Sequence, residues 1–456
     1  MSLRLLFFLV ALSAGPSAYG SDSLRVRIFA LHTPDAVEAR VAEATLRVEA
    51  HGVAAYELPP DETLTLRKAG RRVHLSSSGS EGFSADSVRL STWAYGHVDL
   101  AYTRNRATTI RGYRGDLTIR VDAEGDLLVV NRIHIEDYVA SVVPAEFSFP
   151  YLEGTKVQAV AARTYAVLTK NRQRSAGAPY DLADHEASQR YDGIGKENGD
   201  SRRATRETLG QIITYRGEPA EAVYHASCGG HTAANKDVWS GGRPLPYLQA
   251  KKDPYEQMSP HKSWIKRVRQ QRVHAALAGH AGGAITRIAP AARSQDGRVR
   301  TLTLTRSDGQ TVQIPGDVFR RLVNAGTNRL LLRSTFFDVD AEGDLYVFAG
   351  RGFGHGVGMC QWGTAEQARR GRSYQDILSF YYPGTKLTKA TRGTPTAVAL
   401  LDKPAYVPPS RTADDLASNT PRLDEAGPHS DTLRRANRPG STDPVEVKRK
   451  RKRVGW

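Results

Sequence analysis

The alternation of apolar and polar residues predicts that the first part of the chain is rich in β-strands. Several short stretches alternate in the way that strands with one buried face do: Leu24–Phe29, Thr63–Arg67 and Val73–Leu75. Asp116–Val121 and Asp126–Asn131 also alternate, on either side of an acidic turn that contains glycine, and this pattern predicts a hairpin. We therefore expect residues 24–137 to be β-rich.

From residue 136 the pattern changes to helix, loop and further hairpins. Residues 136–174 are dense in Ala and Arg, with no Gly after Gly154, and predict helix, whereas residues 175–200 are rich in Gly and Asp and predict a loop. Gln211–Tyr215 and Ala220–Ala226 flank a Gly-Glu-Pro turn and predict another hairpin. The later elements that we expect are helices at Lys262–Ala278, Asp317–Asn324, Thr364–Arg370 and Ser373–Tyr382, a strand at Ile285–Ala289, a hairpin of Val299–Arg306 with Thr311–Pro315, and strands at Phe336–Val339 and Asp344–Ala349.

The two ends of the chain differ from its middle. Arg4 precedes an apolar run, Leu5–Leu12, and Ala18-Tyr-Gly20 offers small residues for cleavage, so residues 1–20 predict a secretory signal peptide, with an uncleaved anchor as the alternative. No later segment has the roughly 18 consecutive apolar residues of a membrane-spanning helix, so we expect an exported protein. Residues 387–456 lose apolar periodicity and predict a disordered tail.

The chain has the composition of a soluble globular protein, with 40% hydrophobic and 25% charged residues, and it is strongly basic, with a net charge of +16. In an exported protein this charge favours anionic polymers or membrane surfaces as readily as nucleic acid. The tail ends in a basic block, Lys448–Arg453. This block either attaches the protein to acidic wall polymer or anionic lipid, or is a plain solvated tail.

The stretch Tyr138-Val-Ala-Ser-Val-Val-Pro-Ala-Glu146 ends in a carboxylate just before a turn that is closed by Pro150. The helix that follows carries Lys156, Gln158 and Arg163. A single acid beside a polar, cationic helix face suits acid/base chemistry on a neutral, oxygen-rich substrate. The alternative is that Glu146 is a helix N-terminal acid in an ion pair with Arg163.

The glycine-rich segment 350–363 does not have the pattern of a dinucleotide or phosphate site, because no GxGxxG opens a βαβ unit and the flanking strands predict antiparallel hairpins. Its glycines permit close backbone approach, which would let His355 and Gln361 project into a groove beside Trp362. An aromatic ring with amide and imidazole groups suits a sugar. The alternative is a packed turn in which His355 makes structural hydrogen bonds.

The chain has two cysteines, Cys228 and Cys360, in glycine-rich motifs 132 positions apart. An oxidising compartment would permit a disulfide if the fold brings them together, and two separate buried thiols are the alternative. A thiol–imidazole nucleophile made by Cys228 with His225, His231 or His355 is a weaker alternative. No HExxH occurs, and the histidines lack ligand spacing, so we expect no metal.

Taken together, the chain resembles the SpoIID/LytB family (stage II sporulation protein D and amidase enhancer) over roughly residues 24–386. Five motifs occur in the family's order: Asn131-Arg-Ile-His-Ile-Glu-Asp-Tyr-Val-Ala-Ser-Val-Val-Pro-Ala-Glu146, Lys156-Val-Gln-Ala-Val-Ala-Ala-Arg-Thr-Tyr165, Val223-Tyr-His-Ala-Ser-Cys-Gly-Gly-His-Thr232, Gly352-Phe-Gly-His-Gly-Val-Gly-Met-Cys-Gln-Trp-Gly363 and Tyr381-Tyr-Pro-Gly384.

The resemblance implies binding to peptidoglycan and, as in the sporulation branch, lytic transglycosylase activity on glycan strands stripped of stem peptides. The family's catalytic Glu falls on Glu146, and the residues expected to bind substrate are Lys156, Gln158, Arg163, Tyr224, Ser227, His355, Gln361 and Trp362. The alternative within the family is a non-catalytic enhancer that binds wall glycan and stimulates a separate cell-wall amidase.

One departure from the family concerns metal. Some members of the sporulation branch bind zinc through Cys and His in a loop whose counterpart here is Tyr180-Asp-Leu-Ala-Asp-His-Glu-Ala-Ser-Gln-Arg-Tyr191. Ala183, Ala187 and Ser188 stand where ligands would be, and His185 alone cannot hold a metal, so we expect no zinc and no other cofactor.

The expected fold is α+β, with antiparallel β hairpins and small sheets around a central catalytic helix. Residues 21–135 would form a β-rich part and residues 136–386 the catalytic and glycan-binding core. The expected partners are peptidoglycan glycan strands and a cell-wall amidase, without nucleic acid, and the expected location is periplasmic or associated with the cell wall.

Overall fold

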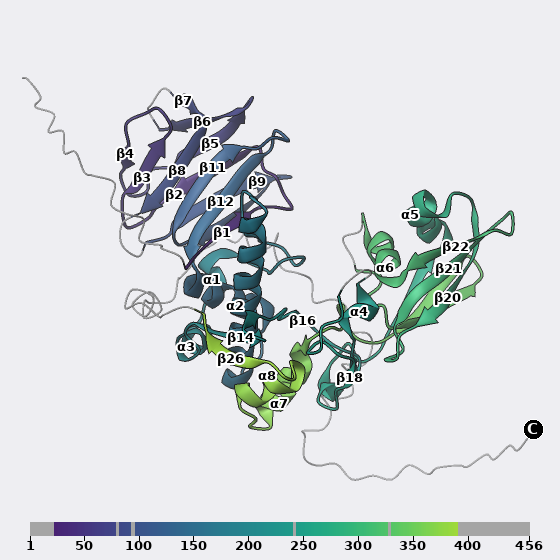
Figure 1. Cartoon of the computed structure of the whole chain (residues 1–456). Coiled ribbons are helices and arrows are strands. Elements are labelled where there is room, and N and C mark those ends of the chain that lie inside the picture. The colour runs from purple at the N-terminus through teal and green to yellow at the C-terminus, as the bar shows by residue number, and fades with distance from the viewer. Residues whose placement is uncertain (1–21, 79–81, 93–95, 240–242, 327–329, 391–456) are drawn as a thin grey trace, which may run out of the picture. The chain divides into compact units, whose positions relative to one another are not determined.

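The structure is a computed structural model that describes residues 22–78, 82–92, 96–239, 243–326 and 330–390 (Figure 1). The predicted signal peptide and nearly all of the predicted tail lie outside these residues. The described part combines helices with mostly antiparallel sheets, which confirms the α+β class.

The N-terminal part holds two sheets, as the alternating pattern predicts. The seven-stranded sheet has the order β13-β1-β12-β11-β8-β3-β4 and the six-stranded sheet the order β10-β9-β2-β5-β6-β7, so both are larger than expected. Their strands are β1 Ser23–Ile28, β2 Ala36–Arg40, β3 Leu46–Ala50, β4 Tyr56–Leu58, β5 Leu64–Ala69, β6 Arg72–Ser77, β7 Phe83–Ala85, β8 Ser87–Thr92, β9 Val98–Arg104, β10 Ala107–Tyr113, β11 Asp116–Val121, β12 Leu127–His134 and β13 Leu182–Ala183. Alternate side chains of both sheets, such as Leu24 and Leu64, enter one apolar core.

Two helices follow the sheets, α1 (Ile135–Glu146) and α2 (Leu152–Ser175), and both contribute side chains to the same core. The helical pattern predicted over residues 136–174 is thus interrupted at residues 147–151, where the turn predicted to close at Pro150 separates the two helices. A proline disfavours helical backbone at the preceding residue, and Pro150 follows Phe149 in the break between the helices. The break makes Glu146 the last residue of α1.

The next segment consists of short elements, some of which form a second apolar core together with α2 and with side chains from residues 357–382. These elements are η1 Gly193–Lys196, α3 Gly199–Glu207, β14 Gln211–Tyr215, β15 Glu218–Pro219, β16 Tyr224–His225, β17 His231–Thr232, α4 Asn235–Val238, β18 Lys251–Lys252 and η2 Glu256–Met258. The predicted hairpin is only partly correct: β15 pairs with β14, but β16 pairs in parallel with β25 (Met359–Cys360).

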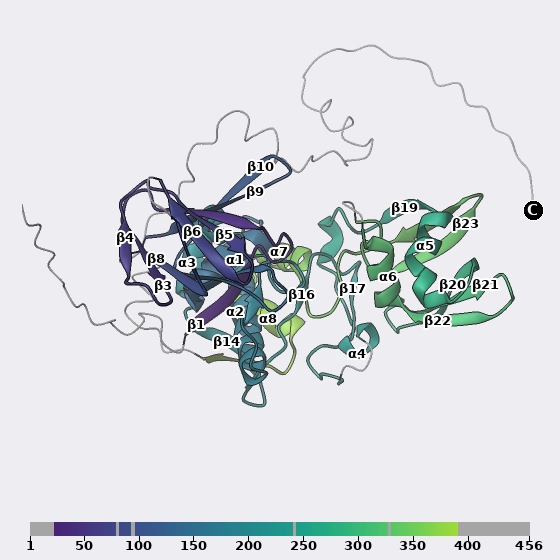
Figure 2. The ribbon, with the colours of Figure 1, turned by 90° about the horizontal axis from the view of Figure 1, so that it is seen from above.

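A third apolar core lies within residues 264–350. Its elements are β19 Trp264–Arg269, α5 Gln270–Ala281, β20 Ile285–Arg293, β21 Val299–Arg306, β22 Thr311–Pro315, α6 Gly316–Asn324, β23 Phe337–Glu342 and β24 Leu345–Gly350. Figure 2 shows α5 and α6 beside the β20–β22 sheet. The helix predicted from Lys262 is wrong over its first part, because residues 264–269 form a strand that pairs with β24.

The described chain ends with α7 (Gln361–Arg369), α8 (Tyr374–Tyr381) and β26 (Lys386–Lys389). The two helices match the prediction within a few residues. The expected start of the tail at Leu387 is wrong, since β26 pairs with β14 and so belongs to the folded body.

Candidate active site

Glu146 ends α1 as a half-buried side chain whose Oε1 accepts a hydrogen bond from the backbone N–H of Arg190 at 2.7 Å. Burial raises the pKa of this carboxyl, and the nearby charges of Glu186 and Asp192 act in the same direction. The Arg190 N–H opposes them, because it stabilises the charged form. The net effect is a carboxyl that keeps its proton at higher pH than an ordinary glutamate.

The loop that supplies Arg190 also supplies Gln189, which joins two tyrosines by hydrogen bonds. Its Oε1 accepts from the hydroxyl of Tyr138 and its Nε2 donates to the hydroxyl of Tyr224, both at 3.1 Å. Burial raises the pKa of both tyrosines, and the charge of Glu146 adds to the effect in each. Tyr138, Gln189 and Tyr224 therefore form a polar chain within electrostatic reach of Glu146.

Gln361 connects the glycine-rich segment to the same place. Its Nε2 donates to the backbone carbonyl of Glu146 at 2.9 Å and lies 3.4 Å from Oε1 of Gln158. Both glutamines are buried. Residues 146, 158 and 361, which the sequence motifs singled out separately, thus meet at the end of α1.

An aromatic group stands beside this junction. The ring of Phe149 lies edge-on to Trp362, with centroids 4.7 Å apart, and packs on Phe147 at 4.8 Å. Phe149 and Trp362 are each partly exposed. The backbone N–H of Trp362 donates to the carbonyl of Ala226, the residue after β16, and so holds the start of α7 against the end of that strand. The aromatic rings offer an apolar surface next to the acid.

The other residues predicted to bind substrate have protein partners. Lys156 pairs with Glu153 at 2.7 Å and with Glu207 at 2.6 Å. Nδ1 of His355 accepts from the backbone N–H of Val357, and burial lowers the pKa of His355 to about 4, so the ring is neutral.

Arg163 and Ser227 are fully buried. Arg163 pairs with Glu136 at 2.6 Å, and the hydroxyl of Ser227 donates to Glu256. Neither side chain is open to a substrate in this conformation. The ion pair expected as the alternative for Glu146 is instead made by Glu136.

Two hollows border the segment around Glu146. One, of about 440 Å³, is lined by Arg190 and by polar neighbours that include Arg111, Glu186 and Asp192. The other, of about 590 Å³, is lined by Pro144, Phe149 and residues of the η1–α3 region. Glu146 is not among the lining residues of either hollow, although its hydrogen-bond partner lines the first and its neighbours in α1 line the second.

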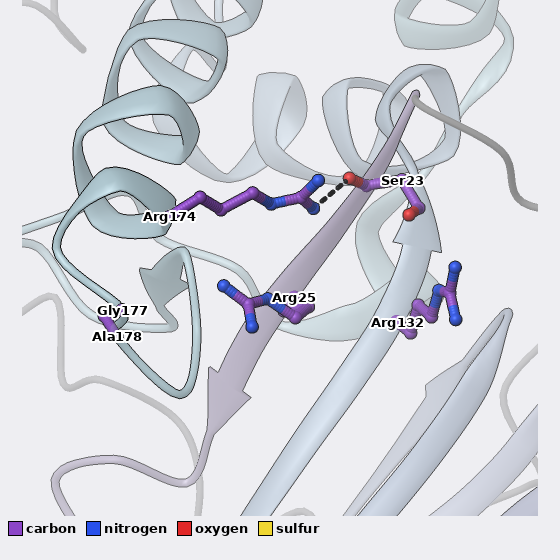
Figure 3. Close-up of a pocket in the computed structure, with 6 residues that line it drawn as sticks. All are labelled: Ser23, Arg25, Arg132, Arg174, Gly177 and Ala178. Atoms are coloured by element: carbon purple, nitrogen blue, oxygen red, sulfur yellow. Dashed lines mark hydrogen bonds between the residues drawn. The ribbon is translucent and has the colours of Figure 1, made fainter.

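A separate basic hollow of about 450 Å³ lies at the start of β1 (Figure 3). Arg25 and Arg174, which line it, both pair with the buried carboxylate of Asp181, at 2.7 and 2.9 Å. Figure 3 also shows Arg174 donating to the backbone carbonyl of Ser23. Because both of these cations already pair with Asp181, this hollow is a weaker candidate for a substrate site.

Both cysteines are buried free thiols, so the disulfide stays a prediction. Their sulfur atoms and a ring nitrogen of His225 lie within 4.8 Å of one another. Burial raises the pKa of both thiols, which argues against a thiolate nucleophile at Cys228.

Sequence reasoning missed Tyr138, Gln189 and Arg190. The stretch 180–191 was considered only for metal ligands, yet its polar residues lie between tyrosines in a glycine- and aspartate-rich loop. That composition is typical of a binding loop. In the described residues we also find no helix that is long and apolar enough to cross a membrane.

Comparison with known proteins shows that the chain belongs to the SpoIID family. The family model, described as "Stage II sporulation protein", matches residues 123–215, and a domain of unknown function, DUF8618, matches residues 261–358.

Three curated relatives show how far the similarity extends. An uncharacterized protein of Brachyspira hyodysenteriae is 32% identical over 58% of this chain and 70% of its own length. The Amidase enhancer of Bacillus subtilis is 28% identical over 56% of this chain and 40% of its own length, so the match spans less than half of that relative. Stage II sporulation protein D of the same organism is 29% identical over 57% of this chain and 76% of its own length.

The burial of Arg163 gives a stability prediction. Arg163→Met leaves the Glu136 carboxylate buried without its cation, so we expect the free energy of unfolding to fall by about 3–5 kcal/mol, measured by urea denaturation. Arg203→Met, which breaks only the exposed pair with Glu207, should change stability little.

A double variant, Arg163→Met with Glu136→Leu, separates lost charge balance from lost packing. It should recover much of the loss, because no unpaired charge remains inside. A double variant no more stable than Arg163→Met would contradict this account of the pair.

Proposed function

We propose that the protein is an exported peptidoglycan-binding lytic transglycosylase in which Glu146 alone acts as acid and then base. The observation that carries the proposal is the carboxyl of Glu146. It is partly desolvated, its pKa is raised, and it is held at one oxygen by a backbone N–H. These are the properties of an acid that can give up its proton and take it back.

The reaction needs only one carboxyl. Glu146 protonates the glycosidic oxygen as the bond from that oxygen to the anomeric carbon of the muramyl sugar breaks. The 6-hydroxyl oxygen of the same sugar then bonds to the anomeric carbon, and its proton returns to the Glu146 carboxylate. The product ends in a 1,6-anhydro sugar and no water is consumed. Most glycosidases need a second carboxylate because water or an enzyme nucleophile must attack.

The surroundings of Glu146 suit the stage of the reaction in which its side chain is a charged carboxylate. After the first proton transfer the carboxylate is charged, and the Arg190 N–H then stabilises it. Gln361 holds the backbone carbonyl of Glu146 and so fixes the end of α1. We assign Gln361 and Gln158 to positioning the acid.

We assign the contacts with the sugar to the partly exposed side chains around Glu146. Phe149 and Trp362 offer ring faces and edges for the C–H groups of a sugar, and the partly exposed Tyr224 offers a hydroxyl for hydrogen bonds. Lys156 and His355 remain proposals for more distant subsites. Arg163 and Ser227 are assigned to the framework because they are buried.

The cellular setting is also part of the proposal. The predicted signal peptide supports export, and the relatives named Stage II sporulation protein D and Amidase enhancer support action at the cell wall. The second of these names also supports another function: the chain would bind wall glycan and stimulate a cell-wall amidase without cleaving anything itself. Under both functions glycan strands are the ligand.

Glu146→Gln tests the acid. It should keep binding to peptide-free glycan strands but lower the formation of anhydro-muramyl products by about 10²–10⁴-fold, because the amide has no acidic proton to give. Products are measured by mass spectrometry of glycan digests. Glu124→Gln, in the exposed turn between β11 and β12, removes the same charge and should leave the rate unchanged.

Unaltered products from Glu146→Gln would exclude Glu146 as the acid. If the wild-type protein cleaves no glycan but stimulates an amidase, and Glu146→Gln stimulates it equally, the enhancer function is correct and the transglycosylase proposal fails.

The pH dependence tests the environment of Glu146. The acid form is present below its pKa, so the rate of cleavage should fall as pH rises through a pKa that lies above the ordinary glutamate value. Glu186→Gln removes a negative charge that helps to raise this pKa, so the fall should move to lower pH while cleavage persists. A fall that stays in place or moves to higher pH in this variant would contradict the assignment.

A further inference from the structure

We propose that His225, Cys228 and Cys360 bind one Zn²⁺ ion, which fastens the glycine-rich segment to the strand beside it. In the part of the chain that the structure describes, these side chains form the one group whose ligand atoms gather closely enough to hold a metal. All three residues are buried. The inference does not depend on whether Glu146 cleaves glycan.

The spacing of the three atoms is close to what zinc requires. Zinc binds thiolate sulfur at about 2.3 Å and imidazole nitrogen at about 2.0–2.1 Å in a tetrahedral arrangement, which puts neighbouring ligand atoms a little under 4 Å apart. Here the three atoms lie within 4.8 Å of one another. Small side-chain rotations would therefore complete the site, without movement of the strands.

The histidine is held in the form that ligates a metal. Nδ1 of His225 lies 3.1 Å from the carbonyl oxygen of Val357, which can only accept, so Nδ1 carries the proton and donates it. The other nitrogen, Nε2, is then a bare acceptor, and it has no hydrogen-bond partner among the described residues although it is buried. A ligating histidine commonly donates its second nitrogen to a backbone carbonyl in this way. An unsatisfied buried nitrogen otherwise costs free energy.

Buried charges of both signs lie beside the cysteines: two carboxylates, and the guanidinium of Arg298, which donates to the backbone carbonyl of Cys228 at 2.6 Å. Sγ of Cys228 lies 3.0 Å from Oε2 of Glu256 and 3.5 Å from Oδ2 of Asp253, both of which are buried carboxylates. When Zn²⁺ binds, each thiol releases its proton and the two thiolates balance the charge of the ion. We leave the fourth position of the ion to water or to a nearby carboxylate such as that of Asp253, to which the hydroxyl of Tyr381 donates.

The sequence could not reveal this site, because the expectation that the chain binds no metal rested on the spacing of the histidines along the chain and on the loop at residues 180–191. His225 and Cys228 are close in the chain, but the third ligand comes from 132 positions after Cys228. It reaches them only because β16 and β25 pair in parallel, with His225 opposite Cys360. The family loop at residues 180–191 takes no part.

A metal ion bound to His225, Cys228 and Cys360 would also help to position the candidate active site. Cys360 caps α7 through the Gly363 N–H, and the next residue, Gln361, holds the end of α1 at Glu146. A metal bridging β16, the turn after it and β25 would therefore fix the start of α7. We assign the metal to positioning rather than to chemistry on the substrate.

Metal analysis of the full chain, reduced and then reconstituted with Zn²⁺, tests the proposal. We expect one equivalent after dialysis for the wild-type protein and its loss in Cys228→Ser and Cys360→Ser. His231→Gln is the matched control, because His231 lies in the same turn but outside the cluster, and it should retain one equivalent. Removal of zinc by a chelator should lower the unfolding temperature of the wild type and of the control.

Cobalt substitution in the wild-type protein keeps the test valid if the cysteine variants do not fold. Co²⁺ bound to thiolates absorbs in the near ultraviolet through sulfur-to-metal charge transfer, and we expect this band at one equivalent. Three results would overturn the proposal: no zinc bound by the reduced protein, zinc retained in both cysteine variants, or cobalt bound without the thiolate band. A Cys228–Cys360 disulfide that re-forms in the presence of zinc would also overturn it.

Discussion

The buried ion pair of Arg163 with Glu136 is the interaction on which the candidate active site depends. The guanidinium joins α2 to the first turn of α1, and it also donates to the backbone carbonyl of Gln211 at the start of β14. Glu136 in turn accepts from the N–H of Gly210. One pair therefore sets three elements against each other in a dry interior, where each charge is satisfied by the other. The pair holds α1 against α2 and so helps to position Glu146 at the end of α1.

The second constraint is the close approach of the glycine-rich segment. Gly358 has φ +72°, and a Cβ there would meet the carbonyl oxygen of Val223 at 2.2 Å. Only glycine permits this contact, which lets β25 lie along β16 and delivers Gln361 to the backbone of Glu146. The glycines thus serve backbone packing rather than phosphate binding. This agrees with the absence of a nucleotide motif in the sequence.

Local sequence patterns predicted the elements whose structure is set by neighbouring residues. They failed for segments whose structure is set by pairing with distant residues. Alternation and the acidic turn that contains glycine found the β11–β12 hairpin, because both signals lie within the hairpin itself. The same reasoning placed residues 264–269 in a helix, since their pairing with β24 lies some 80 positions away and leaves no local trace. Glu146 could be singled out as a lone acid, but Arg163 looked like a substrate cation because its partner, 27 positions earlier, carries no signal of burial.

The proposed double role of Glu146 also explains why its carboxyl need not be fully buried. An acid that acts once could sit in a wholly apolar pocket, where its proton would be held tightly. An acid that must also become a base has to survive as a carboxylate between the two proton transfers. Burial and the charge of Glu186 favour the protonated form, whereas the Arg190 N–H favours the ionised one. The net shift of the pKa is upward, which is the direction that the proposed acid step needs, and the Arg190 N–H supports the carboxylate that the proposed base step needs.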